Sequence, residues 1–355
     1  MNDIKLDQQG FSLVELMVAI LISLLISYAV LEIYLAQTQM YKVSSSQDVI
    51  QSTENALINL VTPIIRSTGF TGCGTIISAV SILNVGGPSP ISTLTTTPIM
   101  IMGYDAGDTP VTITQDNLAN DGNPNDWSPS LDPSLVGDVE QGSDVISVFG
   151  SAPGSFPLGV SVIDPGSGSL TVQSTLGTTI AVGQFGSVSD CSKTVVFQIT
   201  GVTGTNVTHN SGSGVLQNST SALPVNFSVG SQFIQLQQTA FFVGQGPGSQ
   251  SALMRAILVG DTWTIEPIVP GIELMKVQYG IGTSGNITQY VPASAVPNWS
   301  EVYAVRMGFL IEGQLGSGSL GSNQYTVLNT QVTVPVDTRI RHVFEITINL
   351  RNAIS

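Results

Sequence analysis

The sequence predicts an α+β fold, in which one long N-terminal helix packs on a large, mainly antiparallel β domain. Two observations support this prediction. No Gly or Pro interrupts residues 11–62, and these two residue types are the usual breaks in a helix. Later segments alternate apolar and polar residues, as strands with one buried face do. The chain is also rich in Gly, with 37 residues, which is typical of a β domain with many turns.

Residues 11–38 form the apolar half of the predicted helix. From Phe11 to Leu31 the only charged residue is Glu15. About 20 consecutive apolar residues are enough to cross a bilayer as a helix. A carboxylate one turn into such a helix is unfavourable by about 3 kcal/mol, which makes an intramembrane charge a functional-site hypothesis. We therefore expect a single membrane pass, with Glu15 as a candidate contact residue.

Residues 39–67 form the second, amphipathic half of the predicted helix. One stripe of apolar residues recurs there at helical spacing: Val43, Ile50, Leu57, Val61 and Ile64. This stripe predicts that the second half lies against the core of a β-rich domain formed by residues 68–355. A separate surface helix after a linker is the alternative. Pro63 removes a backbone hydrogen bond, so we expect a kink or the end of the helix there.

Alternating or apolar runs predict the strands of the β domain. The clearest alternation places Val305, Met307 and Phe309 on one face, and Phe344, Ile346 and Ile348 repeat it near the C-terminus. Further candidate strands occupy 231–243, 252–259 and 262–268. Loops are expected at 93–98, 116–133 and the Gly/Ser-rich segment 313–323.

The segment Gly10-Phe11-Ser12-Leu13-Val14-Glu15 resembles the signal of type IV prepilins and their pseudopilin relatives. The resemblance implies that a prepilin peptidase removes residues 1–10 as a leader, cuts between Gly10 and Phe11, and methylates the new amine. It also implies that Glu15 pairs with the N-terminal amine of a neighbouring subunit as a filament assembles. A signal anchor that matches this pattern by chance is the alternative.

Later blocks resemble, in order, the PilW branch of minor pilins. They include 66–73, 127–131, 142–146, 271–280, 302–306 and 341–344. The resemblance implies a minor pilin that joins the priming or tip complex of a type IV pilus and supports pilus assembly, twitching motility and adhesion. Its implied partners are the prepilin peptidase, other minor pilins, the major pilin and a tip adhesin.

The implied location is the inner membrane of a Gram-negative bacterium, with the domain in the periplasm, and then the pilus at the cell surface. Two alternatives stay open. A pseudopilin of a type II secretion system would share everything up to Thr62. A tip adhesin or glycan-binding module would use the acidic, loop-rich domain itself as a receptor.

Cys73 and Cys191 are the two cysteines of the chain. They form an even pair in a protein expected outside the inner membrane, where disulfides persist. A disulfide between them is therefore expected, and two buried free thiols are the alternative.

Composition and motifs argue against several other functions. The formal net charge of −14 lacks the basic footprint that nucleic-acid binding needs. His209 and His342 are the only imidazoles, and no hydrolase or zinc motif accompanies them, so we expect no enzyme and no cofactor. Residues 280–285 have the glycine spacing of a dinucleotide site, but the strand-like run after them predicts a turn. The oxygen-rich segment from Asp116 to Asp126 lacks EF-hand spacing, so a solvated turn is favoured over a Ca²⁺ loop.

Overall fold

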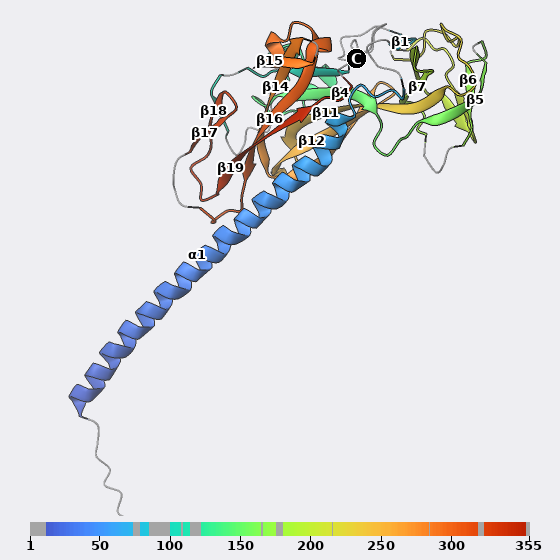
Figure 1. Cartoon of the computed structure of the whole chain (residues 1–355). Coiled ribbons are helices and arrows are strands. Elements are labelled where there is room, and N and C mark those ends of the chain that lie inside the picture. The colour runs from blue at the N-terminus through green and yellow to red at the C-terminus, as the bar shows by residue number, and fades with distance from the viewer. Residues whose placement is uncertain are drawn as a thin grey trace, which may run out of the picture.

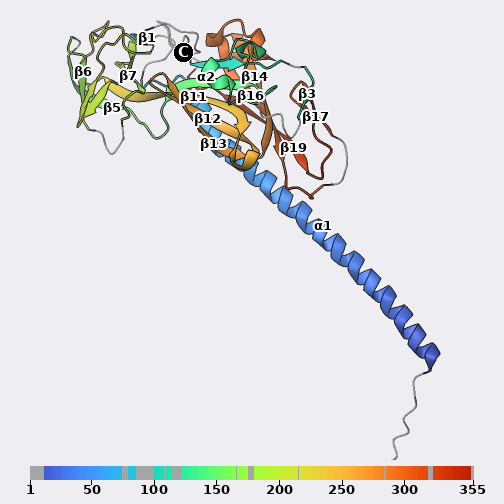
Figure 2. The same cartoon turned by 180° about the vertical axis from the view of Figure 1, so that it is seen from behind.

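The computed structural model describes residues 12–73, 79–84, 100–107, 109–113, 122–164, 166–174, 180–214, 216–283, 285–318 and 323–352. One long helix, α1 (Leu13–Arg66), carries a β-rich domain at its C-terminal end (Figure 1). The first half of α1 projects away from the domain, and the second half lies along it (Figure 2). The predicted α+β fold with a mainly antiparallel β domain is confirmed.

The docked part of α1 buries one stripe of side chains, which we call the docking face: Ser46, Ile50, Thr53, Leu57, Val61 and Ile65. The predicted stripe is correct at Ile50, Leu57 and Val61 but wrong at its two ends. Val43 and Ile64 are only half-buried, and at the first end of the stripe the small Ser46 lies at the close approach of Gly313 instead. One continuous helix with a docked second half replaces the alternative of a separate surface helix.

The predicted break at Pro63 is only partly right, because α1 continues for three residues beyond it. The carbonyl of Pro63 accepts a hydrogen bond from the Ser67 amide at 3.0 Å, so the last turn remains closed. After it, Thr68 forms a bridge with Gly150, and the Gly69 amide donates to the Phe149 carbonyl at 2.8 Å. The helix therefore ends where its chain joins the sheet.

The largest sheet is 12-stranded and is organised around β11 (Gln232–Gln245). The N-terminal half of β11 pairs with β7 and β5, and its C-terminal half pairs with β4 and β12. Its other strands have the following bounds: β1 (Ala79–Ser81), β2 (Ile101–Tyr104), β4 (Val145–Ser151), β5 (Leu158–Asp164), β6 (Ser169–Val172), β7 (Phe185–Ser189), β8 (Thr194–Gln198), β9 (Gly201–Thr203), β10 (Asn206–Thr208), β12 (Ser251–Val259) and β13 (Thr262–Pro270). Because β11 serves both halves, it joins two lobes of the domain.

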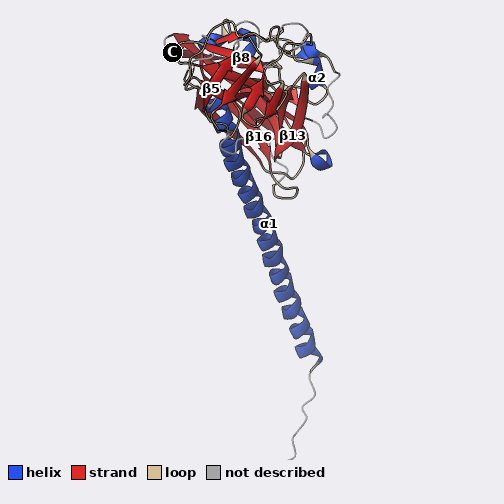
Figure 3. Cartoon of the chain, turned by 90° about the vertical axis from the view of Figure 1, so that its right-hand side faces the viewer, coloured by secondary structure: helices blue, strands red, loops and turns tan. Residues whose placement is uncertain are grey.

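The lobe farther from the projecting part of α1 contains β5 to β10 (Figure 1). It has its own apolar core, which includes Val160, Leu170, Phe197 and Phe233. The lobe nearer to α1 contains the main core, to which the docking face contributes Ile50, Leu57, Val61 and Ile65. Figure 3 shows the strands gathered at one end of the long helix.

A second sheet has the order β15 (Asn286–Val291), β14 (Ile272–Thr283), β16 (Val302–Glu312), β19 (Arg341–Asn349). The predicted alternation is confirmed, since Val305, Met307 and Phe309 of β16 lie in the main core. Leu310 points to the opposite face and joins a small third core. That core packs under a 3-stranded sheet made of β17 (Gln324–Val327), β18 (Thr330–Thr333) and β3 (Val111–Thr112).

Three predicted strands match β11, β12 and β13 closely. The glycine-spaced segment 280–285 begins in the last residues of β14 and ends in the connection to β15, where Gly285 has φ +81. A strand follows it rather than a helix, so the turn prediction is confirmed. The predicted loop 93–98 lies outside the described residues, as do 116–121 and 319–322 within the other two predicted loops.

Candidate functional site

The start of α1 is closed by a capping box between Ser12 and Glu15. The Ser12 hydroxyl accepts from the Glu15 amide at 3.2 Å, and the Glu15 carboxylate accepts from the Ser12 amide at 3.1 Å. The pairing of Glu15 expected from the sequence is with a neighbouring subunit, and this contact within the chain was not predicted. The Ser-x-x-Glu spacing of a capping box could have revealed it. Gly10 and Phe11 lie outside the described residues.

The projecting part of α1 is apolar on every side, and its large apolar side chains from Leu13 to Tyr41 are all exposed. Its length and composition are sufficient to cross a membrane. A second carboxylate, Glu32, lies on this part of the helix and accepts a hydrogen bond from the Tyr28 hydroxyl. Within the described residues, the domain leaves all of these large apolar side chains exposed.

The docked part of α1 is held by polar contacts as well as by its apolar stripe. The Gln314 amide donates to the Ser46 hydroxyl at 3.1 Å. His342 Nδ1 lies 2.7 Å from Glu54 Oε1, which joins β19 to the helix. Near the helix end, Asn352 donates to the Thr68 carbonyl at 3.0 Å. The C-terminal segment therefore contacts α1 through His342 of β19, and it contacts the chain just after the helix through Asn352.

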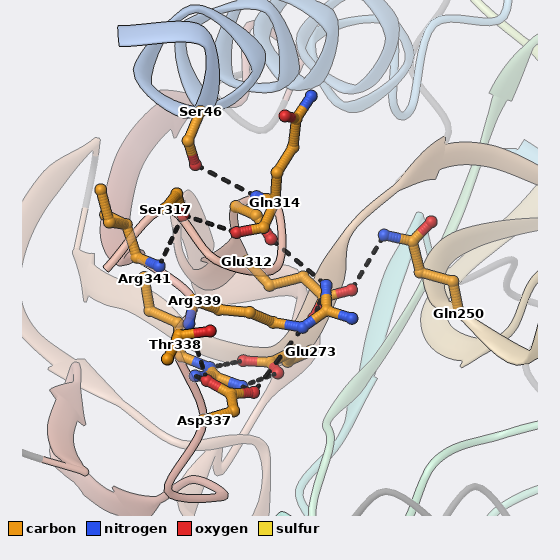
Figure 4. A network of polar contacts seen from close by, with 12 residues as sticks. Ser46, Gln250, Glu273, Glu312, Gln314, Ser317, Asp337, Thr338, Arg339 and Arg341 are labelled. Carbon is orange, nitrogen blue, oxygen red and sulfur yellow. Dashed lines mark hydrogen bonds and ion pairs between the residues drawn. The ribbon is translucent and has the colours of Figure 1, made fainter. Parts of the chain in front are cut away.

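A partly buried cluster of charges supports these contacts, and we call it the base network: Glu273, Glu312, Asp337, Arg339 and Arg341. Arg341 donates to Glu273 at 2.7 and 2.9 Å and to Asp337 at 2.7 and 2.9 Å. Arg339 lies 3.2 Å from Glu312 and also donates to the Gly313 carbonyl at 3.2 Å. Figure 4 shows this network on the side of the 313–318 loop that faces away from Ser46.

Protonation in the base network follows from burial and pairing. Burial tends to raise the pKa of Asp337, but hydrogen bonds from Arg341 and from the Arg339 amide outweigh it, so the pKa is lowered. Burial raises the pKa of Glu273, and Arg341 only partly offsets this. The pKa of Arg341 is itself raised, because its two acidic partners outweigh its burial. A guanidinium fork that serves two carboxylates holds the loop before β19 in one geometry.

Burial also shifts the pKa of two acids outside the base network, Asp144 and Glu140. Burial raises the pKa of Asp144 to about 6, an effect that Lys276 at 2.9 Å opposes. Burial, and then the charge of Glu273, raise the pKa of Glu140 to about 8. Within the described residues, Glu140 Oε2 has no hydrogen-bond partner. Glu140 is therefore mainly a neutral acid at pH 7.

The two histidines do not form a catalytic arrangement in the described part of the chain. His209 is fully buried against Phe197, and neither ring nitrogen has a partner among the described residues. Burial lowers its pKa to about 4. His342 forms a hydrogen bond with Glu54.

No group of three potential metal ligands occurs among the described residues. Asp116 and Asp121 lie outside them, and Asn123 and Asp126 form a local capping turn with a 3.0 Å contact.

Cys73 and Cys191 form a disulfide with a Cα–Cα distance of 4.7 Å. Cys73 follows the end of α1 by seven residues, and Cys191 lies between β7 and β8. The adjacent Ser187 hydroxyl donates to the Thr71 carbonyl at 3.2 Å. The bridge thus ties the chain that leaves the helix to the lobe built from β5 to β10.

Comparisons with known proteins match two parts of the chain. Residues 5–30 match the prokaryotic N-terminal methylation motif, which covers the exposed start of α1. Residues 240–352 match the family described as type IV pilus-assembly protein W, from the end of β11 through β19. Among solved structures, a type IV-like pilin from Thermus thermophilus matches with 17% identity, 49% of this chain, 86% of that chain and a TM-score of 0.24. No curated protein matches the chain.

A methylation motif at the start of one long apolar helix defines the chain as type IV pilin-like. Within that class, it is a protein with a PilW domain, and the domain contains the strands and the basic residues that hold the helix. The motif implies processing by a prepilin peptidase and pilin partners, and together with the apolar helix it indicates membrane anchoring.

Proposed function

We propose that this protein is a minor pilin of the priming or tip complex of a type IV pilus, and that it supports pilus assembly, twitching motility and adhesion. The observation that carries the proposal is the combination of a methylation motif with a PilW domain in one chain. The PilW domain favours a pilus over a type II secretion system. The helix has 54 residues and is docked on the domain only in its second half. Its exposed first half can pack in a bundle of helices, and the domain can make contacts at the surface.

The proposed sequence of events begins in the inner membrane, with the domain in the periplasm. The leader 1–10 is removed at Gly10, and Phe11 becomes the methylated N-terminus. Residues 11–38 hold the protein in the bilayer, while 39–67 remain docked on the domain 68–355. Other minor pilins, the major pilin and a tip adhesin are the proposed partners, and the assembled pilus carries the protein to the cell surface.

Glu15 has a defined role in this proposal. In the single chain its carboxylate accepts only the Ser12 amide within the described residues. A carboxylate can accept several hydrogen bonds at once. The N-terminal amine of a neighbouring subunit therefore adds a charge-assisted contact in a medium that screens poorly. That contact favours the assembled state and sets the axial register of the subunits.

The test separates capping from assembly. Gln replaces Glu in capping boxes, so Glu15→Gln keeps the cap and removes the charge. Ser12→Ala removes the hydroxyl acceptor and keeps the charge. If Glu15 acts by ion pairing, Glu15→Gln reduces co-purification with the other minor pilins and lowers the count of surface pili, while Ser12→Ala has little effect. The opposite order would assign Glu15 to helix capping alone.

The processing step has a separate test. Gly10→Val adds a branched side chain where the peptidase must approach the backbone closely, so full-length precursor is expected to accumulate. Mass spectrometry of the wild-type protein should find methylated Phe11 at the N-terminus. Any other mature N-terminus contradicts the proposal.

A further inference from the structure

Two polar loops at the base of the domain each expose one large apolar residue. Leu315, in the loop 313–318, is 64% exposed, and Val336, in the loop 334–339, is 67% exposed. The two loops are joined by hydrogen bonds, from the Gly316 amide to the Thr338 hydroxyl at 3.0 Å and from the Gly318 amide to the Thr338 carbonyl at 2.7 Å. We call these two segments the base loops.

The base loops lie beside α1 where it leaves the domain. The Ser46 hydroxyl accepts from the Gln314 amide, and Gln39 Nε2 donates to the Gly316 and Ser317 carbonyls at 3.5 and 3.4 Å. A Cβ on Gly313 would come within 2.0 Å of the Ser46 hydroxyl, so the loop and the helix are in close contact. Figure 4 shows the loop directly under this part of the helix. The loop thus runs along α1 from the level of Ser46 towards that of Gln39.

The base network makes this arrangement rigid. Arg339 and Asp337 of the second base loop pair with Glu312 and Arg341. The Ser317 hydroxyl also accepts the Ile340 amide at 3.3 Å. These contacts hold the two base loops in place, and Leu315 and Val336 remain exposed on them.

The height of the base loops can be compared with the thickness of a bilayer. Gln39 lies 26 residues after Leu13, the first residue of α1, which is about 39 Å of helix at 1.5 Å per residue. A bilayer has a hydrocarbon core of about 30 Å and a total thickness of about 40–45 Å with its headgroups. If Leu13 lies at the inner edge of the hydrocarbon and α1 has the usual tilt of about 20°, Gln39 stands about 37 Å above that edge, at the outer face of the headgroup layer.

The side chains at this level suit such a surface. Tyr34 and Tyr41 are exposed on α1, and aromatic residues of this kind are enriched where a helix leaves the membrane. Lys42 is exposed and lies next to Gly316, and no ion pair of Lys42 occurs among the described residues. A free cation near the surface is attracted to anionic lipids.

We infer that, in the membrane-anchored protein, the base loops rest on the outer leaflet of the same bilayer that α1 crosses, with Leu315 and Val336 inserted among the headgroups. This inference rests on the membrane-spanning role of α1 in the proposed function. The base loops therefore contact the lipid surface at one fixed position along α1. This contact holds the domain in one position on the membrane before assembly, and extraction of α1 into a filament breaks it.

The test uses the full-length chain in vesicles of anionic and zwitterionic lipids. Single cysteines at Leu315, Val336, Val229 and Leu21 carry an environment-sensitive fluorophore, and brominated lipids serve as the quencher. Val229 is 76% exposed and lies in the farther lobe, close to Gln232 at the start of β11, so it is a matched apolar control. Leu21, in the projecting helix, reports whether α1 is inserted.

The expected result is blue-shifted, quenched fluorescence at Leu315 and Val336, none at Val229, and the strongest quenching at Leu21. The inference is overturned if the fluorophore at Leu21 is quenched while those at Leu315 and Val336 are quenched no more than the one at Val229. In that case the membrane anchor still holds. No quenching at Leu21 contradicts the anchor itself. If Leu315 and Val336 become protected only when other pilins are added, the surface binds a neighbouring subunit and the lipid contact is wrong.

Discussion

Removing the disulfide is expected to destabilise the domain strongly, and the size of the effect follows from the position of the bridge. Cys73 and Cys191 are 118 residues apart. In the chain-entropy model, opening a loop of this size increases the conformational entropy of the unfolded state. The free energy of unfolding falls by about 5 kcal/mol as a result. For a domain of roughly 290 residues, with an unfolding entropy of about 2.1 cal/mol/K per residue, this lowers Tm by about 8 °C.

The assay is thermal unfolding of the detergent-solubilised full chain, followed by near-ultraviolet circular dichroism. Cys191→Ser and Cys73→Ser should lower Tm by similar amounts, and the double variant should lower it no further, because one bridge is lost in each case. Additive losses would show that the two side chains stabilise the domain independently of each other. Two alkylatable thiols in unreduced wild-type protein would show that the bridge between Cys73 and Cys191 does not form.

Three further predictions concern the interior, and each is measured by denaturant unfolding of the same preparation. Arg341→Met leaves Glu273 buried without its partner and should cost about 3–5 kcal/mol. Leu57 is on the docking face and 1% exposed, so Leu57→Ala should lower the free energy of unfolding by about 2–5 kcal/mol. Leu60 is on the same helix and 42% exposed, so Leu60→Ala should lower it by under about 1 kcal/mol. Equal losses would contradict the assignment of the docking face. Glu140 has its pKa raised from 4.5 to about 8, so the folded state holds a proton that the unfolded state releases between these values; stability should fall as pH rises from about 4.5 to 8. Glu140→Gln should flatten that dependence, and an unchanged slope would show that another group is responsible.

The local features of the chain were readable from sequence because their signals are short-range. The unbroken run without Gly or Pro predicted α1, and the alternation in β16 and β19 predicted which faces enter the main core. The spacing of Gly10, Phe11 and Glu15 relative to the apolar run is likewise a local pattern. The capping box at Ser12 and Glu15 was equally local and was missed only because Glu15 was considered for a contact between chains.

The ends of the docking face were not readable in this way. Periodicity selects a side of a helix, but it does not show which residues face a close approach of another segment. Ser46 is buried because Gly313 passes within contact distance of it. Ile65, rather than Ile64, is fully buried because the last turn of α1 joins β4.

The long-range polar contacts needed the tertiary structure. Arg339, Arg341 and His342 are close together in the sequence. Their acidic partners come from β14, from β16, from the loop before β19 and from α1. Glu273 is 68 residues from Arg341, and Glu54 is 288 residues from His342. The register of β14, β16 and β19, together with the way α1 packs on them, determines which of these residues come within contact distance. The sequence alone determined that this chain has a membrane-length helix with a processing signal and a β domain. The packing of that helix on the sheet decided which residues hold the two together, because burial and pairing depend on distances that only the folded chain defines.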